Sequence, residues 1–210
     1  MFRALVSFYG CTPIISQPAK LTVLENTPTL TVSAITGDLS RIYGENGNAA
    51  SFTITGAHLS GDVTITAPTN FYISNSESGP FINTLSVSQT AGTINTQTIY
   101  IRLKPAVNAA TYNESISFSS LNATINDLAI ATTTVSRKEL TITGTTVNNK
   151  TYNGNDTATF TSQGSLVGIA HNDDITFTAT ATFNNANAGI DKPVTMVANL
   201  VGAKKDNYAV

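Results

Sequence analysis

The 210-residue chain is poor in charge, because Asp, Glu, Lys and Arg together make up only 11% of it. Typical soluble domains carry roughly 25%. The net charge is −2 and no run of Lys or Arg occurs, so the sequence lacks the basic surface that attracts nucleic acid. Long apolar runs are missing too, and none approaches the roughly 18–20 residues of a membrane-spanning helix. We therefore expect neither a nucleic-acid partner nor a membrane span within this sequence.

Cysteine, tryptophan and histidine are scarce as well. The only cysteine, Cys11, excludes an internal disulfide and a Cys-based zinc cluster. The only histidines, His58 and His171, lie in turn-like stretches, and no G-x-S-x-G motif is present. Nucleophilic catalysis needs a nucleophile, a base and a residue that orients the base. The sequence therefore predicts that the protein is not an enzyme and has no catalytic residue and no cofactor.

The stretch HNDD, residues 171–174, is the best candidate for a metal site. Asn172, Asp173 and Asp174 carry the oxygen ligands that calcium prefers. The chain has no D-x-D-x-D-G loop, however, and Asp and Asn side chains also close turns by bonding to the backbone. We therefore predict a turn at HNDD, and no metal site.

What fills the chain instead is Thr, Asn, Ser and Ala, arranged in short stretches where apolar and polar residues alternate. Alternation places every second side chain on one face, which is the pattern of a β-strand buried on one side. No stretch shows the periodicity of a helix. The alternating stretches of the first two thirds are SFTIT, DVTIT, NFYIS, LSVSQ, TIYIRL, ESISFS and DLAIATTTV. We predict an all-β protein of tandem antiparallel β-sandwich modules, with a second, smaller β domain and no substantial helix.

Seven or eight short strands at spacings of about ten residues are typical of an Ig-like sandwich. Tyr112 lies just before the stretch containing Ile116 and Phe118, where such sandwiches often place a tyrosine whose hydroxyl bonds back to the chain. Tyr112 is either this tyrosine corner or an ordinary edge tyrosine. The sequence of residues 29–136 also resembles the Ig-like repeats of secreted bacterial multidomain proteins, above all in FTITGAHLSGDVTITAPTNFYIS and TIYIRLKPAVNAATYNESISFSS.

Changes in composition divide the chain into four segments. Residues 1–24 resemble the last two strands of a truncated Ig-like module, ending in AKLTVL, with Cys11 in a hairpin. Residues 25–28 form a linker, and residues 29–136 form the Ig-like sandwich. A second β domain occupies residues 137–210 and stops at NYAV, where its last strand should be finishing. The chain is therefore expected to be a slice of a longer array.

The second β domain resembles a known family. Residues 138–210 are similar to the YDG repeat domain, which recurs in large bacterial surface and haemagglutinin-like proteins. The resemblance rests on the turn of Tyr152, Asn153 and Gly154, the turn at residues 187–189, Lys192, and the ending Gly202…Asn207-Tyr208. The family usually carries Asp where this chain has Asn153. If that Asp only closes a turn, Asn replaces it well; if it were a metal ligand, its loss would argue against a metal here.

A modification site and several binding groups remain as weaker candidates. The tripeptide DTA resembles a short bacterial O-glycosylation motif with Thr157 as acceptor, which requires Thr157 to be exposed. Tyr72, Tyr100 and Tyr152 are either sugar-stacking groups or framework tyrosines. The loops RIYGENGN, residues 41–48, and NSESGP, residues 75–80, could form a site at the end of a sandwich.

These features favour a structural role over chemistry. The leading prediction is a non-enzymatic spacer region of an exported, adhesin-like bacterial surface protein, located outside the cell or at its surface, with the signal and anchor outside this sequence. Its partners would be neighbouring β modules of the same longer chain, and host or matrix glycans or proteins. The alternatives are a carbohydrate- or protein-binding module that uses sandwich-end loops, and an accessory part of a larger secreted enzyme.

Overall fold

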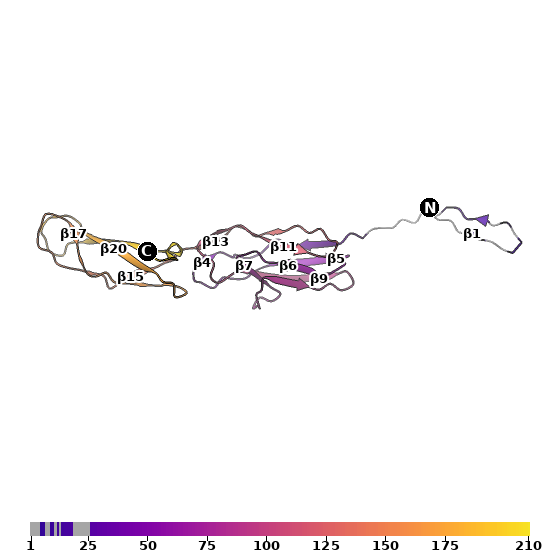
Figure 1. The fold of residues 1–210 in the computed structure, drawn as a ribbon, viewed down its shortest axis with the longest axis horizontal. Coiled ribbons are helices and arrows are strands. Elements are labelled where there is room, and N and C mark those ends of the chain that lie inside the picture. The colour runs from indigo at the N-terminus through magenta and orange to yellow at the C-terminus, as the bar shows by residue number, and fades with distance from the viewer. Residues whose placement is uncertain (1–4, 7–8, 11, 13, 19–25) are drawn as a thin grey trace.

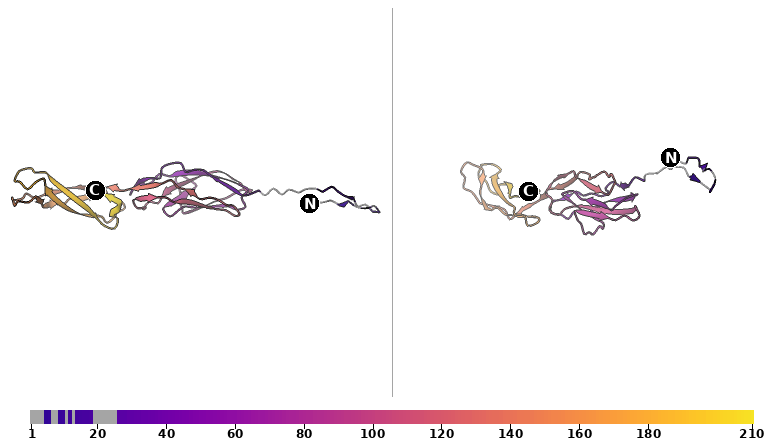
Figure 2. Two further views of the ribbon diagram at one scale, coloured as in Figure 1. Left: turned by 90° about the horizontal axis from the view of Figure 1, so that it is seen from above. Right: turned by 45° about the vertical axis from the view of Figure 1, so that its right-hand side comes forward.

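A computed structural model describes residues 5–6, 9–10, 12, 14–18 and 26–210, and within them the protein is all β. The described residues contain no α-helix; their one helical element is the three-residue 3-10 turn η1 (Lys205–Asn207). None of their helices could cross a membrane, since none is long and apolar enough. The all-β prediction is therefore confirmed. Figures 1 and 2 show two β units that follow one another along the long axis.

Two short strands come before these units. They are β1 (Leu5–Val6) and β2 (Ile14–Ile15), which pair antiparallel. The predicted strand at residues 19–24 and the residue Cys11 lie outside the described residues. The assignment of residues 1–24 to a preceding module, and of residues 25–28 to a linker, stays a prediction.

The N-terminal unit, residues 29–136, contains two four-stranded sheets and a small third one. The first sheet has the order β3-β5-β9-β7 and the second β12-β11-β6-β8. Their strands are β3 (Thr29–Val32), β5 (Ala50–Ala57), β9 (Ile94–Leu103), β7 (Phe71–Ser74), β12 (Leu128–Ala129), β11 (Ser115–Ser119), β6 (Val63–Thr66) and β8 (Thr84–Val87). The third sheet has the order β10-β13-β4 and consists of β10 (Ala110–Tyr112), β13 (Thr133–Ser136) and β4 (Arg41–Ile42).

The core of this unit lies between the two four-stranded sheets. Along β5, Phe52 and Ile54 are buried while the residues between them are half-buried, as the alternating sequence predicts. The rings of Phe52 and of Phe118 on β11 meet edge to face across the gap, with their centroids 6.1 Å apart. Two sheets with one alternating face each therefore bury a common apolar layer. Whether this sandwich is Ig-like stays a prediction.

The C-terminal unit, residues 138–210, has a three-stranded sheet and three two-stranded ones. The sheet orders are β17-β20-β21, β15-β19, β16-β18 and β14-β22. Their strands are β17 (Thr157–Ala158), β20 (Thr176–Phe183), β21 (Val194–Val201), β15 (Thr141–Thr143), β19 (Ser165–Val167), β16 (Thr146–Val147), β18 (Phe160–Ser162), β14 (Lys138–Glu139) and β22 (Tyr208–Ala209).

The core of the C-terminal unit is thinner. Leu140, Ala158, Ile175, Ala181 and Tyr208 are buried. The other apolar residues of the inward faces of β20 and β21 are only half-buried. A unit of this size has little apolar area to bury, so its contacts with the neighbouring unit matter for its order.

The two units are joined by a strand and not by a loop. β13 runs parallel to β4 of the N-terminal unit, and after the single residue Arg137 the chain continues as β14, parallel to β22 of the C-terminal unit. The Tyr43 N–H donates to the Ser136 carbonyl at 2.9 Å, and the Leu140 N–H donates to the Ala209 carbonyl at 2.8 Å. The chain is therefore hydrogen-bonded to one unit up to residue 136 and to the other from residue 138.

Candidate functional site

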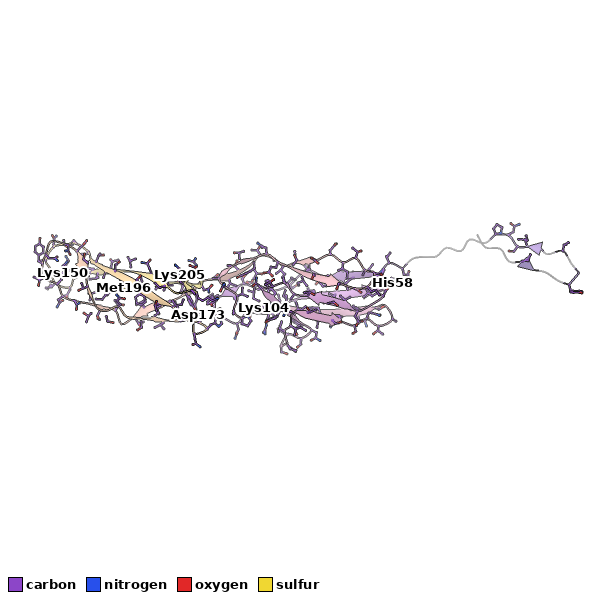
Figure 3. The ribbon with its side chains drawn as sticks, in the orientation of Figure 1. His58, Lys104, Lys150, Asp173, Met196 and Lys205 are labelled. Carbon is purple, nitrogen blue, oxygen red and sulfur yellow. The ribbon has the colours of Figure 1, made fainter. Side chains whose placement is uncertain are left out.

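Where the units meet, two tyrosines from different units share one carboxylate. Tyr43 follows β4, Tyr208 lies on β22, and both hydroxyls donate to Asp173 Oδ2, at 2.9 and 2.6 Å. Asp173 belongs to the HNDD stretch, so this turn approaches the N-terminal unit (Figure 3). The tyrosine rings meet edge to face with their centroids 5.4 Å apart, and both side chains are buried. We call Tyr43, Asp173 and Tyr208 the junction cluster; it consists of charge-assisted hydrogen bonds from two buried phenols to a half-buried carboxylate.

The environment of the junction cluster raises the pKa of both phenols. Burial is the larger cause and the hydrogen bond to Asp173 the next, and together they raise the pKa of Tyr43 from 10.0 to about 12 and that of Tyr208 to about 12. Each phenol therefore stays protonated and keeps its donor well above neutral pH. Because the Tyr43 phenol stays protonated, its hydroxyl continues to donate to Asp173 of the other unit at neutral pH.

A second set of contacts lies beside the junction cluster. Asn108 Oδ1 accepts from Lys204 Nζ at 2.9 Å and from Asn207 Nδ2 at 3.3 Å, and Asn207 Oδ1 accepts from the Ala109 N–H at 2.7 Å. Asn207 is buried although it is polar. A buried amide with several partners fixes orientation, because any other docking angle would leave it unsatisfied.

A cavity lies at the opposite end of the C-terminal unit, between the loops of residues 148–156 and 184–193. We call it the tip cavity; its volume is about 490 Å³. Val147, Phe183 and Val194 contribute apolar surface, and the exposed side chains of Tyr152 and Ile190 also line it. Five of its other lining residues are asparagines, and the rest include Lys150, Asp191 and Lys192. Its size falls within the range of small-molecule sites, which combine apolar walls with a few polar groups.

Both loops of the tip cavity are held by a lysine in the same way. Lys150 Nζ donates to Asn155 O, to Asn155 Oδ1 and to Thr157 O. Lys192 Nζ donates to the equivalent atoms of the other loop, which are Asn185 O, Asn185 Oδ1 and Asn187 O. In each loop the asparagine Oδ1 also accepts from the N–H two residues later. We call these two arrangements the lysine clamps.

The lysine clamps decide what the tip cavity can bind. An ammonium group has three donors, and each clamp supplies three acceptors, so neither lysine has a donor left for an anion. The remaining polar side chains are asparagine amides and the hydroxyls of Thr151 and Tyr152, apart from the carboxylate of Asp191. The cavity therefore offers amides and hydroxyls to a ligand, while the two ammonium groups direct their hydrogen bonds to the loops.

Comparison with protein families matches residues 136–210 to the YDG domain. The tip cavity, both lysine clamps, Asp173 and Tyr208 all lie in this stretch. Residues 136–210 are a YDG domain. No curated protein and no solved structure matches the chain.

The three residues of the family turn lie in the first loop of the YDG domain. Asn153 Oδ1 accepts from the Asn155 N–H at 3.3 Å, which is a turn-closing bond that an Asp could make equally well. Gly154 adopts a left-handed φ of 76°, and its position is open to solvent space. Tyr152 lines the tip cavity and is 68% exposed. Asn153, at the position where the family usually carries Asp, therefore closes a turn in this chain.

The other predicted residues lie apart from one another. The Tyr112 hydroxyl donates to the Asn108 carbonyl at 2.7 Å, four residues upstream, as a tyrosine corner does. Thr157 is exposed on β17, so its O-glycosylation stays a prediction. His58 lies at one end of the N-terminal unit (Figure 3). His171 lies at the junction, where its ring meets that of Tyr43 edge to face. Among the described residues no three His, Cys, Asp or Glu side chains gather as ligands for a metal.

The two loops proposed as sandwich-end sites have different environments. The loop of residues 41–48 contains the buried Tyr43 and contacts the YDG domain, so part of it is used at the junction. The loop of residues 75–80 is held by its own bonds, such as that of the Ser76 N–H to Ser74 Oγ. Asp173 was expected only to close a turn, and its N–H does bond to the Ala170 carbonyl at 3.0 Å. Its partner Tyr43 is 130 residues away, and no local pattern signals such a contact.

Proposed function

We propose that this chain is a non-enzymatic structural segment that serves as a stiff spacer in an exported bacterial surface protein of the adhesin type. The observation that carries the proposal is the junction, where a single residue separates strands β13 and β14 of the two units. Flexible linkers allow domains to reorient, whereas a connection with hardly a free residue leaves little freedom. A spacer needs this property, because it must hold another domain at a fixed distance.

The contacts beside the strand support the same function. Asp173 of the C-terminal unit accepts from the Tyr43 hydroxyl of the N-terminal unit, and Asn108 and Asn207 connect the units a second time. Polar contacts of this kind are weak alone, but Leu140, Ile175 and Tyr208 also belong to one buried apolar cluster with residues of the N-terminal unit. Together these contacts only need to prevent bending about a connection that is already extended. The low content of charge leaves few surface groups that respond to pH or salt, which suits work outside the cell.

Distance measurements between spin labels test the proposal directly. Labels are placed at two exposed sites, Glu77→Cys in the N-terminal unit and Thr178→Cys on β20, with Cys11→Ser in the background. We expect a narrow distance distribution, which broadens when Asp173→Ala removes the shared acceptor. The neighbouring substitution Asp174→Ala is the matched control and should leave the distribution narrow. A broad distribution in the unsubstituted background would refute the spacer.

A second candidate function is supported by the tip cavity. An amide-rich cavity with an exposed tyrosine fits a polyhydroxyl ligand such as a glycan, because amides both donate and accept and the ring offers an apolar face. A glycan array with Tyr152→Ala and Tyr100→Ala as paired variants separates the two functions. Glycan binding that is lost only with Tyr152→Ala supports a lectin-like module. If no glycan on the array binds, the spacer function is the one that remains.

A further inference from the structure

The strand β21 forms an open edge of the YDG domain. It pairs with β20 along all eight of its residues, and none of the other described strands lies on its other side. The Asn184 N–H bonds to Pro193 O, so these two residues form a hydrogen-bonded pair next to the first pair of the ladder, Phe183 and Val194. Hydrogen-bonded and non-hydrogen-bonded pairs alternate along an antiparallel ladder, so every second residue of β21 from Val194 onwards is not bonded to β20. The N–H and C=O groups of Val194, Met196, Ala198 and Leu200 therefore point away from β20. No hydrogen bond among the described residues reaches these groups.

This edge lacks the features that usually protect an open strand. Proteins commonly block such edges with lysine, proline, a bulge or a very short strand. β21 is VTMVANLV, which contains no charged residue and no proline, and its register with β20 is unbroken. Val197 and Val201 are exposed on its outer face, at 56% and 46%. An edge of this length and composition is suited to accept another strand.

We propose that β21 pairs antiparallel with β21 of a second copy of this chain. The two-fold axis would pass beside Val197, which then faces Val197 of the second copy in a close, non-hydrogen-bonded pair. In this register Met196 faces Ala198, Val194 faces Leu200, and Thr195 faces Asn199. Every unpaired backbone group of the edge finds a partner, and no like charges meet.

The choice of a second copy rests on this self-complementarity. The pairing matches apolar with apolar and polar with polar residues, and on the inner face it sets the long Met196 against the small Ala198. Shifting the axis by one residue keeps the hydrogen bonds but places Val197 opposite Asn199, so the register centred on Val197 is favoured. The result is a continuous sheet of β17-β20-β21 from each copy, which associates two molecules side by side.

Single cysteines test the register. Val197→Cys and Asn199→Cys are introduced separately into a Cys11→Ser background; both positions are exposed on the same face of β21. In the proposed dimer the Cβ atoms at position 197 lie about 4.5–5.5 Å apart, whereas those at position 199 are separated by roughly 13 Å along the strands. Mild air oxidation should give a disulfide-linked dimer for Val197→Cys and none for Asn199→Cys. Equal cross-linking of the two variants, or none of either, overturns the proposed pairing.

Sedimentation over a concentration series tests the association itself. The unsubstituted chain should shift with rising concentration from 22.0 kDa towards twice that mass. Val197→Lys, which places two like charges opposite each other, should remain monomeric, and Ala198→Pro, which removes an outward N–H only, should do the same. A monomer at every concentration overturns the proposal, and so does a dimer that survives both substitutions. A chain that stays monomeric but binds an unrelated strand peptide along this edge would also overturn it.

Discussion

At the scale of single residues, two glycines with similar φ angles have different roles. Gly44 and Gly154 have left-handed φ angles of 82° and 76°. A Cβ added to Gly154 would meet nothing within 4 Å, whereas one added to Gly44 would lie 2.3 Å from Ala170 Cβ of the YDG domain. Gly154 is therefore needed for its backbone alone, and Gly44 also for the close approach of the two units.

This difference gives a matched pair of substitutions. Gly154→Ala should lower the free energy of unfolding by about 1 kcal/mol, because alanine is strained in the left-handed region. Gly44→Ala should cost the same plus roughly 1–3 kcal/mol for the clash with Ala170. Urea denaturation of the two variants measures the difference. Equal losses would mean that Gly44 and Ala170 are not held in contact.

The raised pKa values of the two tyrosines in the junction cluster lead to a prediction of how the stability of the fold depends on pH. Their folded-state pKa is raised to about 12 from 10.0, so their contribution is fully present below pH 10 and is lost as the pH rises towards 12. The thermal midpoint should therefore fall between about pH 10 and 12. In the double variant Tyr43→Phe, Tyr208→Phe the fall should be shallower. An identical alkaline profile for both proteins would contradict the role given to these phenols.

At the scale of elements, the lysine clamps replace regular structure in two loops that contain none. Each holds a carbonyl, a side-chain oxygen and a second carbonyl around one ammonium group, which satisfies polar groups that a strand ladder would otherwise pair. Lysine performs this task from five residues before the asparagine in one loop and seven after it in the other. The shared geometry thus does not depend on a shared spacing.

Removing one ammonium group at a time tests the clamps. Lys150→Met keeps the apolar stem and should increase hydrogen exchange of the amides in residues 150–157, without affecting residues 185–192. Lys192→Met should have the reverse effect, and Lys205→Met, at an exposed lysine with no hydrogen bond to these loops, serves as the control. If the amides of both loops exchange at the same rate in all three variants, the loops do not depend on the clamps.

The strands were predictable from sequence where each buries one face. Phe71 and Ile73 are both buried on β7, as alternation predicts, and the same holds for Ile99 and Ile101 on β9. After the turn at Gly154, the alternation of Ala158 and Phe160 indicates a single strand. The chain forms two there, because β17 pairs with β20 while β18 pairs with β16. Alternation in the sequence indicates which face of a strand is buried, but not which neighbouring strand it pairs with. The change from one sheet to another at Thr159 therefore could not be predicted.

The candidate sites were less predictable. The tip cavity contains the family turn, which the sequence did single out, but Lys192 became part of a clamp only through contacts with Asn185 and Asn187. The junction cluster joins Tyr43 to Asp173, a contact between modules, and local composition carries no information about it. Sequence thus revealed the loops and strands, while the bonds between distant residues required the fold.

At the scale of the whole molecule, the account depends on two small units acting as one body. The YDG domain has a thin core, so it gains order from the junction as well as from its own strands. The unit before it supplies β4 and Tyr43, and the segment from β13 to β14 bonds to both units in turn. A spacer built in this way would resist bending at its weakest point, which is the boundary between domains.

Residual dipolar couplings test this claim most directly. Amide couplings from β5 and β9 report the orientation of the N-terminal unit, and those from β20 and β21 report that of the YDG domain. We predict that one alignment tensor fits all four strands. If the two units require tensors of different magnitude, they move independently, and the claim that the junction makes them one rigid body is wrong.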